Sequence, residues 1–232
     1  MKMIKSFAVA ALLAVSASAT AQFTNGSSSS SSTANTDGWS TIWVQYNASS
    51  FKYDVKNADD QSFNGLSFGY SQAFSVAQNM PLFVEAGFGV QYSFYTEDMN
   101  DYSGEDEIKF NMFSAKVPVN LIYKFDLPNS NISLMPFVGA KIRYNLSAKL
   151  KYEFKEDGYE DDDYYDMDTD IDLFDKKEAD NPFKRMQLGW QIGLKARFNN
   201  SFLVGLSYGS DFSEIAKKTK VGGLNVTLGY TF

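Results

Sequence analysis

The stretch MQLGWQIGLKARF, from Met186 to Phe198, alternates strictly between two kinds of side chain. Its even-numbered positions are all apolar, whereas its odd-numbered positions are Gln, Gly, Lys or Arg. A period of two over so long a run predicts a β-strand whose two faces meet different surroundings. The run is too long for a typical globular sheet strand of about 5 or 6 residues, but it fits a tilted strand that crosses a bilayer. The pattern is typical of a transmembrane barrel, apolar toward lipid and polar toward the lumen.

Seven further segments repeat this alternation, and in each the apolar parity is assigned to lipid. Two positions do not fit smoothly. Trp43 falls on the inward parity, and Pro118 interrupts a strand, where it predicts a bulge or a locally unpaired position because proline has no N–H to donate. Together the segments predict an all-β fold, an eight-stranded antiparallel up-and-down transmembrane β-barrel. The seven are 40–48, 63–74, 82–95, 110–125, 132–146, 202–208 and 221–232.

The expected connections alternate between long and short. Outer-membrane barrels have short periplasmic turns and longer extracellular loops, and an even number of strands leaves both termini in the periplasm. Turn-forming residues on the short side, such as Asn199-Asn200, agree with this assignment. The long connections are 49–62, 96–109, 148–185 and 210–219, and the short ones are 75–81, 126–131 and 199–201.

The N-terminal region predicts export. Residues 1–21 have two lysines, an apolar stretch and an Ala-Thr-Ala site, as in a secretory signal peptide, and residues 22–38 form a serine-rich segment expected to be a flexible linker. The barrel domain is then 39–232. No window has eighteen consecutive apolar residues, which argues against helical membrane spans. The lack of cysteine excludes disulfides and an acylated N-terminal cysteine.

The inward face is rich in basic residues, and Glu85 is the one acid within the expected strands. The interior of an eight-stranded barrel is just wide enough for its own side chains, so these charges are expected to fill the lumen as a charge network. Because a buried cation needs a partner, we expect Glu85 to pair with Lys124, and Lys195 or Arg197 as further partners. A small anion-conducting path is the alternative. The network comprises Glu85, Lys116, Lys124, Lys141, Arg143, Lys195 and Arg197.

The segment 153–180 is strongly acidic. Its fourteen acids and three bases give it a charge of −11, so with −7 for the whole chain the remaining residues carry +4. The spacing D-x-D-x-D resembles the start of a calcium loop, but Ile171 and Lys177 stand where an EF-hand needs Gly and Glu. A solvated surface loop is the simpler interpretation, and weak divalent-cation binding is the alternative. The candidate ligands are Asp161, Asp162, Asp163, Asp166, Asp168, Asp170 and Asp172.

Three pieces, SAKVPVNLIYKF (114–125), ISLMPFVGAKIRYNLSAKL (132–150) and MQLGWQIGLKARFNNSFLVGLSYGSDF (186–212), resemble hairpins of the small outer-membrane β-barrel domain family, the porin-like and PorT-like proteins. The terminal GLNVTLGYTF is similar to the assembly signal of such barrels, with Leu228, Tyr230 and Phe232 at alternating positions. The resemblance implies an outer-membrane location in contact with lipid and lipopolysaccharide. It also implies biogenesis through periplasmic chaperones and the barrel-assembly machinery.

Several functions remain open at this point. The first is a non-enzymatic barrel with a structural, adhesive or surface-interaction role through its long extracellular loops, without a cofactor or a nucleic-acid partner; its external ligand is unknown. A small porin or ion-conducting channel is the alternative. An enzyme is disfavoured because the chain has no histidine, which excludes Ser–His catalysis, Cys–His catalysis and metal binding by His. A secreted soluble calyx would require apolar residues such as Leu188, Ile192, Leu194 and Val226 to point inward.

Overall fold

The computed structural model describes residues 37–55, 59–76, 80–101, 104–153, 169–177, 179 and 181–232. Across this part of the chain the regular structure is β-sheet, and no helix is long and apolar enough to cross a membrane. The strands are β1 (Trp39–Tyr53), β2 (Gln61–Ser75), β3 (Leu82–Asp101), β4 (Gly104–Tyr123), β5 (Phe125–Asp126), β6 (Ile132–Glu153), β7 (Thr169–Asp172), β8 (Met186–Phe198), β9 (Phe202–Asp211) and β10 (Thr219–Thr231).

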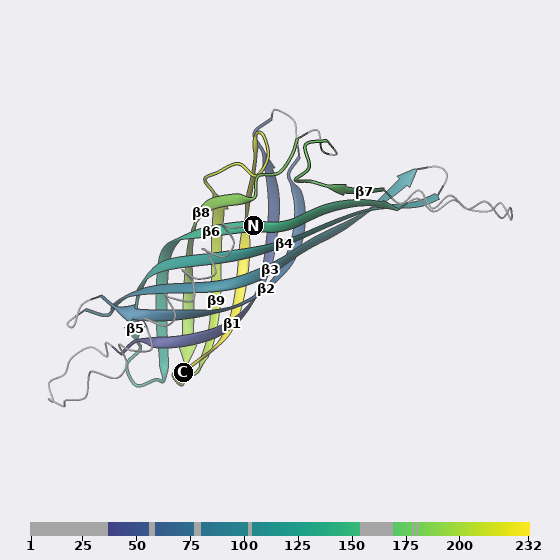
Figure 1. Ribbon diagram of the computed structural model, residues 1–232. Helices are drawn as coiled ribbons and strands as arrows, with labels where there is room; N and C mark the ends of the chain where they lie inside the picture. The colour runs from purple at the N-terminus through teal and green to yellow at the C-terminus, as the bar shows by residue number, and fades with distance from the viewer. Residues whose placement is uncertain are drawn as a thin grey trace.

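Eight long strands close into an antiparallel barrel, as the sequence predicted (Figure 1). Successive long strands pair with each other, β1 pairs with β10, and the β4–β6 pairing completes the circle. The two short strands extend this framework without adding to the circle. β5 continues the line of β4 beside β6, and β7 pairs with the outer part of β6. Closure leaves the barrel without a free sheet edge, so every backbone group within it can be paired.

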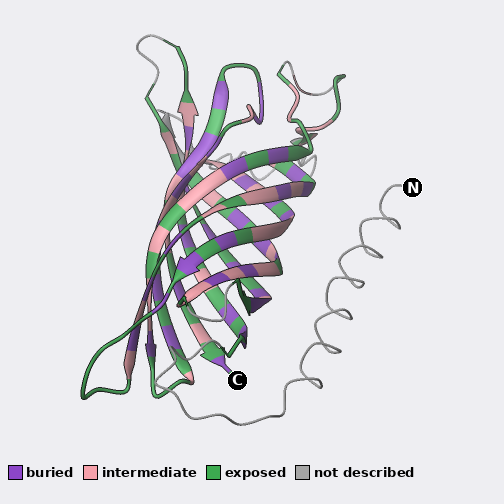
Figure 2. Cartoon of the chain, turned by 90° about the vertical axis from the view of Figure 1, so that its left-hand side faces the viewer, coloured by how far each residue is buried: buried purple, intermediate pink, exposed green. Residues whose placement is uncertain are grey.

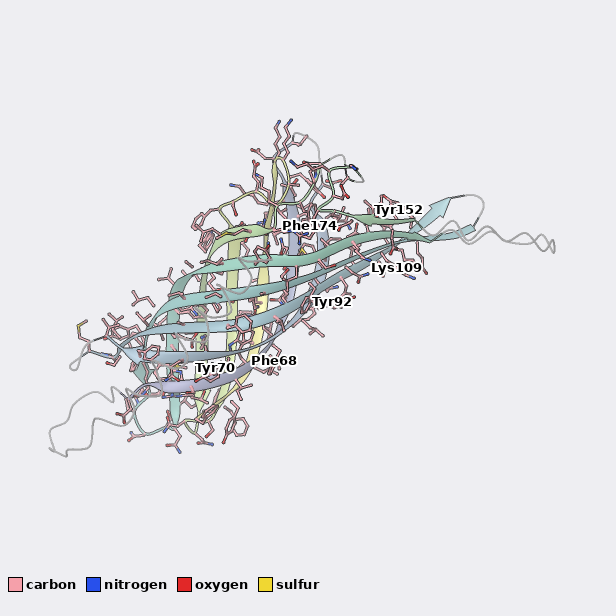
Figure 3. All side chains as sticks on the ribbon, in the orientation of Figure 1. Phe68, Tyr70, Tyr92, Lys109, Tyr152 and Phe174 are labelled. Atoms are coloured by element: carbon pink, nitrogen blue, oxygen red, sulfur yellow. The ribbon has the colours of Figure 1, made fainter. Side chains whose placement is uncertain are left out.

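The outward face is apolar, which confirms the prediction that the apolar side of each strand faces outward. Buried and exposed residues alternate along the strands (Figure 2), as the period of two requires. Phe68 and Tyr92, for example, project away from the barrel wall (Figure 3). The four residues that a soluble calyx would need inside, Leu188, Ile192, Leu194 and Val226, are between 45% and 53% exposed. The calyx interpretation is therefore wrong.

Every long strand except β8 is longer than predicted, and β3, β4 and β6 are the longest. β3, β4 and β6 reach 20, 20 and 22 residues, so most of the expected loop 96–109 and the first part of the expected loop 148–185 are strand. β7 lies within the second of these expected loops as well. The pairing of β2 with β3 ends at Asn64 and Phe94, and the pairing of β6 with β8 ends at Tyr144 and Met186. Beyond these points β3, β4, β6 and β7 form a sheet that projects from the rim, at the right of Figure 1. We call it the projecting sheet.

The lumen is layered rather than uniformly polar. An apolar cluster near the short turns, the turn-side seal, contains Trp39, Ala73, Phe83, Ile122, Met135, Phe137 and Leu203. A second cluster near the long loops, the loop-side seal, contains Phe51, Phe63, Phe110, Met112, Ala148, Ile215, Ala216 and Val221. The expectation of a wholly polar interior is therefore wrong at both ends, where inward-facing aromatic and aliphatic side chains pack together.

The short turns use backbone conformations that asparagine tolerates. Asn129, Asn199 and Asn200 have φ values of 58°, 50° and 59°, in the left-handed region where asparagine is enriched. Pro118 pairs in register with Lys141 of β6, but the pairing of β3 with β4 skips from Ala86–Val119 to Gly89–Lys116. The predicted unpaired position is thus on the β3 side of Pro118. The register shift between β4 and β6 lies elsewhere, at Phe113 and Ser114, where Leu146 of β6 is the extra residue.

Candidate functional site

A polar chamber lies between the two seals. It has a volume of about 70 Å³, and its wall contains residues from strands all around the barrel. A water molecule needs about 10 to 15 Å³ of such space, so the chamber has room for a few small solutes. Four of the six predicted lumen cations line it, together with Glu85. These cations are Lys116, Lys141, Arg143 and Lys195.

Glu85 is the acceptor at the turn-side end of the chamber. Its Oε1 accepts hydrogen bonds from Lys195 Nζ at 2.5 Å and from Asn120 Nδ2 at 2.9 Å. Asn120 Oδ1 in turn accepts a bond from Gln191 Nε2 at 2.6 Å. The carboxylate is only 3% exposed, so these donors replace the water that it would otherwise bind. Of the three partners considered for Glu85, the structure places Lys195 in contact.

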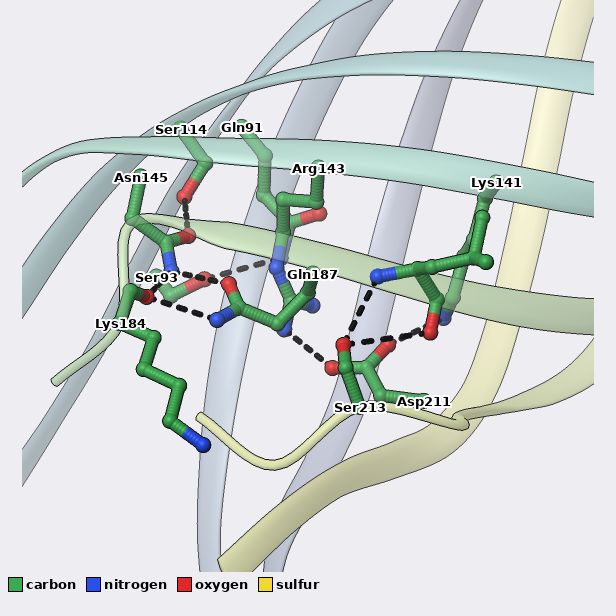
Figure 4. Close-up of polar contacts among 11 residues, drawn as sticks. Gln91, Ser93, Ser114, Lys141, Arg143, Asn145, Lys184, Gln187, Asp211 and Ser213 are labelled. Carbon is green, nitrogen blue, oxygen red and sulfur yellow. Dashed lines mark hydrogen bonds and ion pairs between the residues drawn. The ribbon is translucent and has the colours of Figure 1, made fainter. Parts of the chain in front are cut away.

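Asp211 is a second buried acid that the sequence analysis did not place in a strand. Its Oδ2 lies 2.6 Å from Arg143 Nη2, and its Oδ1 lies 3.8 Å from Lys141 Nζ (Figure 4). The space for this contact comes from Gly189, where a Cβ would lie 2.8 Å from both Asp211 Oδ1 and Lys141 Cε. β9 was expected to end at Tyr208, but it continues to Asp211. Extending the odd-numbered inward parity of that strand by two steps would have found this residue.

Beside Arg143, amide and hydroxyl side chains link three neighbouring strands. Ser114 donates to Asn145 Oδ1 at 2.7 Å, and Asn145 Nδ2 donates to Gln187 Oε1 at 2.5 Å (Figure 4). Gln187 Nε2 then donates to the backbone oxygen of Lys184 at 2.7 Å. These bonds fix the wall of the chamber below the loop-side seal. They leave little freedom for its side chains to move aside.

Lys116 differs from the other chamber cations because no carboxylate of the described residues pairs with it. Its ammonium donates to Gln45 Oε1 at 2.5 Å and lies 5.0 Å from the centre of the Trp43 ring. This contact explains why Trp43 faces inward. Gly69 and Gly89 on the next two strands leave room for the indole, since a Cβ at either position would lie within 2.5 Å of it. The ring offers Lys116 a π face in place of an anion.

The remaining two predicted lumen cations lie toward the short turns. Lys124 was expected to contact Glu85, but its Nζ pairs with Asp126 at 3.1 Å, because Lys124 follows the end of β4 and lies beside β5. Arg197 lies over the Trp39 ring at 4.8 Å, and Lys195 has a similar contact with Phe137 at 5.0 Å. Asp126 was not predicted because it was assigned to a turn. The structure thus divides the seven residues between the chamber and its turn-side border.

The acidic segment is only partly within the described residues. Asp161, Asp162, Asp163, Asp166 and Asp168 lie outside them. Asp170 and Asp172 are in β7 rather than in a loop. Asp170 pairs with Lys149 at 3.7 Å, and Asp172 accepts a bond from the Phe174 backbone N–H. In the described ranges, no group of three acids, histidines or cysteines is arranged to hold a metal ion.

The projecting sheet is a second candidate site, on the outside of the molecule. Beyond Phe94, seven residues of β3 continue without a partner from β2, which at about 3.3 Å per residue is roughly 23 Å of strand. The sheet carries charges of both signs, including a Lys109–Glu107 pair at 2.9 Å. Lys109 and Tyr152 mark its position in Figure 3. At its base, Tyr95 and Leu150 pack against the loop-side seal.

The closed antiparallel barrel, with its apolar exterior and polar chamber, is an architecture that a known family model also describes. The model for the outer membrane protein beta-barrel domain matches residues 7–232. The chain belongs to this family. As an outer membrane beta-barrel domain protein it lies in the outer membrane, with its apolar face in lipid and lipopolysaccharide around it.

Comparison with solved structures finds outer membrane proteins that are similar to this chain at low sequence identity. The attachment invasion locus protein Ail of Yersinia pestis, in complex with the heparin analogue sucrose octasulfate, is 18% identical, with a TM-score of 0.45 over 84% of this chain and 99% of Ail. Neisserial surface protein A is 15% identical, with a TM-score of 0.41 over 83% and 97%. A major outer membrane protein from Thermus thermophilus is 15% identical, with a TM-score of 0.43 over 83% and 99%. No curated protein matches the chain.

Proposed function

We propose that this outer membrane barrel is a closed surface-interaction protein that contacts an external partner through the projecting sheet. The observation that carries the proposal is the length of β3, β4 and β6. About 9 to 11 residues suffice for a tilted strand to cross a bilayer, whereas these strands have 20 to 22. The extra residues are unnecessary for anchoring, and ordering them costs conformational entropy.

The edge of this sheet supports a binding role. An edge strand presents a row of N–H and C=O groups that a partner strand can pair with. In the described part of the chain, β3 beyond Phe94 has β4 on one side and no strand on the other. The opposite edge is covered by β7 along Lys149–Tyr152 of β6. The partner that fits best is therefore an extended segment of another protein, added beside β3.

A shortened hairpin tests this role. Residues 97–108 would be replaced by an Asn-Gly turn between Thr96 and Lys109, which are directly paired in β3 and β4. The barrel is expected to fold, because the removed residues lie outside both seals. Attachment of cells that express the variant to a panel of immobilised matrix proteins and polysaccharides should fall at least tenfold relative to the parent chain.

A second variant changes the same edge without removing it. Thr96→Pro with Asp98→Pro keeps the hairpin length but removes two backbone donors from β3. If strand pairing is the mode of contact, this double variant should lose attachment as well. Undiminished attachment by the shortened chain, at equal surface abundance, would rule out the projecting sheet as the contact surface.

We also propose that the lumen is filled rather than open. Two apolar seals border the chamber, and residues such as Phe83, Met112, Met135 and Ile215 are 0% exposed. A permeating ion would have to shed its hydration among these side chains, which is costly. These observations disfavour the small porin.

Electrical recording distinguishes the filled lumen from an open porin. The purified protein in a planar bilayer is expected to give no stable unit conductance in 1 M potassium chloride. A double variant that opens both seals, Phe83→Gly with Met112→Gly, is the positive control for insertion. Regular, repeated conductance steps from the parent protein would contradict the filled lumen and favour the channel.

The remaining assignments follow from the same proposal. The short turns and both termini of the barrel face the periplasm, and the projecting sheet faces outward, as in other barrels with an even strand number. Leu228, Tyr230 and Phe232, all more than half exposed on the outer face, form the signal read by the barrel-assembly machinery after delivery by periplasmic chaperones. The protein acts without catalysis.

A further inference from the structure

The charges around the chamber do not balance. Four cationic side chains line it, and two carboxylates, Glu85 and Asp211, contact three of them. Two positive charges are left over, in a space that lies between the two seals. An uncompensated charge buried in this way costs several kcal/mol, so it needs a counter-ion or must lose its proton.

The surplus is concentrated at one side of the chamber. Lys116 of β4 and Arg143 of β6 are directly paired. Lys141 lies two residues before Arg143, on the same inward face of β6. Like charges directly opposite each other in a sheet destabilise it. Asp211 compensates one of the three positive charges. Gln45 and Trp43 contact Lys116 without contributing a negative charge.

One hydrogen-bond donor of Arg143 has no acceptor. Arg143 is 4% exposed and lines the chamber, yet its Nε has no hydrogen-bond partner among the described residues. The ammonium of Lys116 has three donors, and one of them goes to Gln45. Buried donors of this kind are rarely left unsatisfied in proteins. The missing acceptor must be small enough for a chamber of about 70 Å³.

We propose that the chamber holds one small inorganic anion of halide size as a structural counter-ion, bound by Lys116 and Arg143. A monovalent ion of this class accepts the unused donors of Lys116, lies beside the Arg143 guanidinium and removes half of the charge surplus. Because the seals close on both sides, the anion enters while the barrel folds and is retained afterwards. The site is therefore occluded and is no part of a conduction path.

Refolding in different salts tests the proposal. The protein would be refolded into detergent at one ionic strength in sodium chloride, sodium bromide or sodium gluconate, whose anion is too large for the chamber. The melting temperature is expected to be higher by about 5 °C in chloride and bromide than in gluconate. Crystals grown from the bromide sample should give an anomalous peak between Lys116 and Arg143.

Two variants separate a specific site from general salt effects. Lys116→Met should remove the difference between the salts and should melt, in gluconate, no lower than the parent protein, because an apolar chain of similar length replaces an uncompensated charge. Lys124→Met changes another buried lumen lysine, outside the chamber lining, and should keep the difference. If Lys116→Met fails to fold, the bromide diffraction of the parent protein decides whether an anion lies between Lys116 and Arg143.

The proposal is overturned by equal melting temperatures in all three salts together with a chamber without a bromide peak. That result would mean that Lys116 is neutral and that water fills the chamber. It is also overturned if Lys124→Met loses the difference between the salts, because the effect would then be general screening.

Discussion

Asp211→Ala is expected to lower the free energy of unfolding by about 3 to 5 kcal/mol, since it removes the acid from a buried pair and leaves Arg143 and Lys141 without one. The carboxylate is the common partner of both cations, at 2.6 and 3.8 Å, and its side chain is 1% exposed. Water cannot easily replace it, because the site lies between the two seals. Urea titration of the refolded protein in detergent, followed by tryptophan fluorescence, measures the change.

Glu214→Ala is the control for this variant, three residues further along the chain. Glu214 pairs with Lys184 at 3.8 Å, but the two side chains are 40% and 61% exposed. Exposed pairs contribute about 0 to 1 kcal/mol, so the loss should stay in that range. Equal losses for the two alanine variants would mean that the Asp211 site is solvated and that the seals do not close.

Ile192→Arg is expected to lower the free energy of unfolding by about 2 to 4 kcal/mol in lipid vesicles, because it places a charge on the lipid face near the bilayer midplane. Ile192 is the middle residue of β8 and is 53% exposed. Its immediate neighbour in the chain, Gln191, faces the chamber. Denaturant titration of the vesicle-inserted barrel measures the loss.

Phe198→Arg, at the last residue of the same strand, provides the depth control. Near the interface the cost of an arginine falls to about 0 to 1 kcal/mol. The ratio between the losses in the free energy of unfolding of the two variants thus reports depth in the membrane rather than loss of an apolar side chain. Similar costs at both positions would contradict the tilted transmembrane placement of β8.

The barrel and its lipid face were predictable because alternation is a local property of a strand. The bounds of β8, Met186–Phe198, agree with the predicted ones, since apolar and polar positions change sharply at both of its ends. The outer parts of β3, β4 and β6 were not predictable in this way. Five of the six residues in TEDMND (96–101) are polar, so the sequence shows no apolar–polar alternation there, and only their pairing with β4 makes them a strand.

The chamber was partly predictable. The positions of the lumen cations follow from parity alone, but their partners depend on which strand lies beside which and in what register. Trp43 is accommodated by glycines 26 and 46 positions away, and Asp211 meets Arg143 from a distance of 68 residues. The seals were missed for a different reason. Assigning apolar parity to lipid gives no weight to Phe63, Phe83 or Met112, which are apolar on the inward parity, and Phe51 was assigned to a connection.

Unequal strand lengths give the molecule a tall side and a short side. β8, β9 and β10 have 13, 10 and 13 residues, and the connection after β9 folds inward to place Ile215 in the loop-side seal. In the orientation proposed above, sugar chains of neighbouring lipopolysaccharide would cover the short side first and leave the β3–β4–β6 side as the part with the greatest reach. A large particle at the cell surface would approach this barrel from one direction, so recognition would depend on how the protein is rotated about the membrane normal.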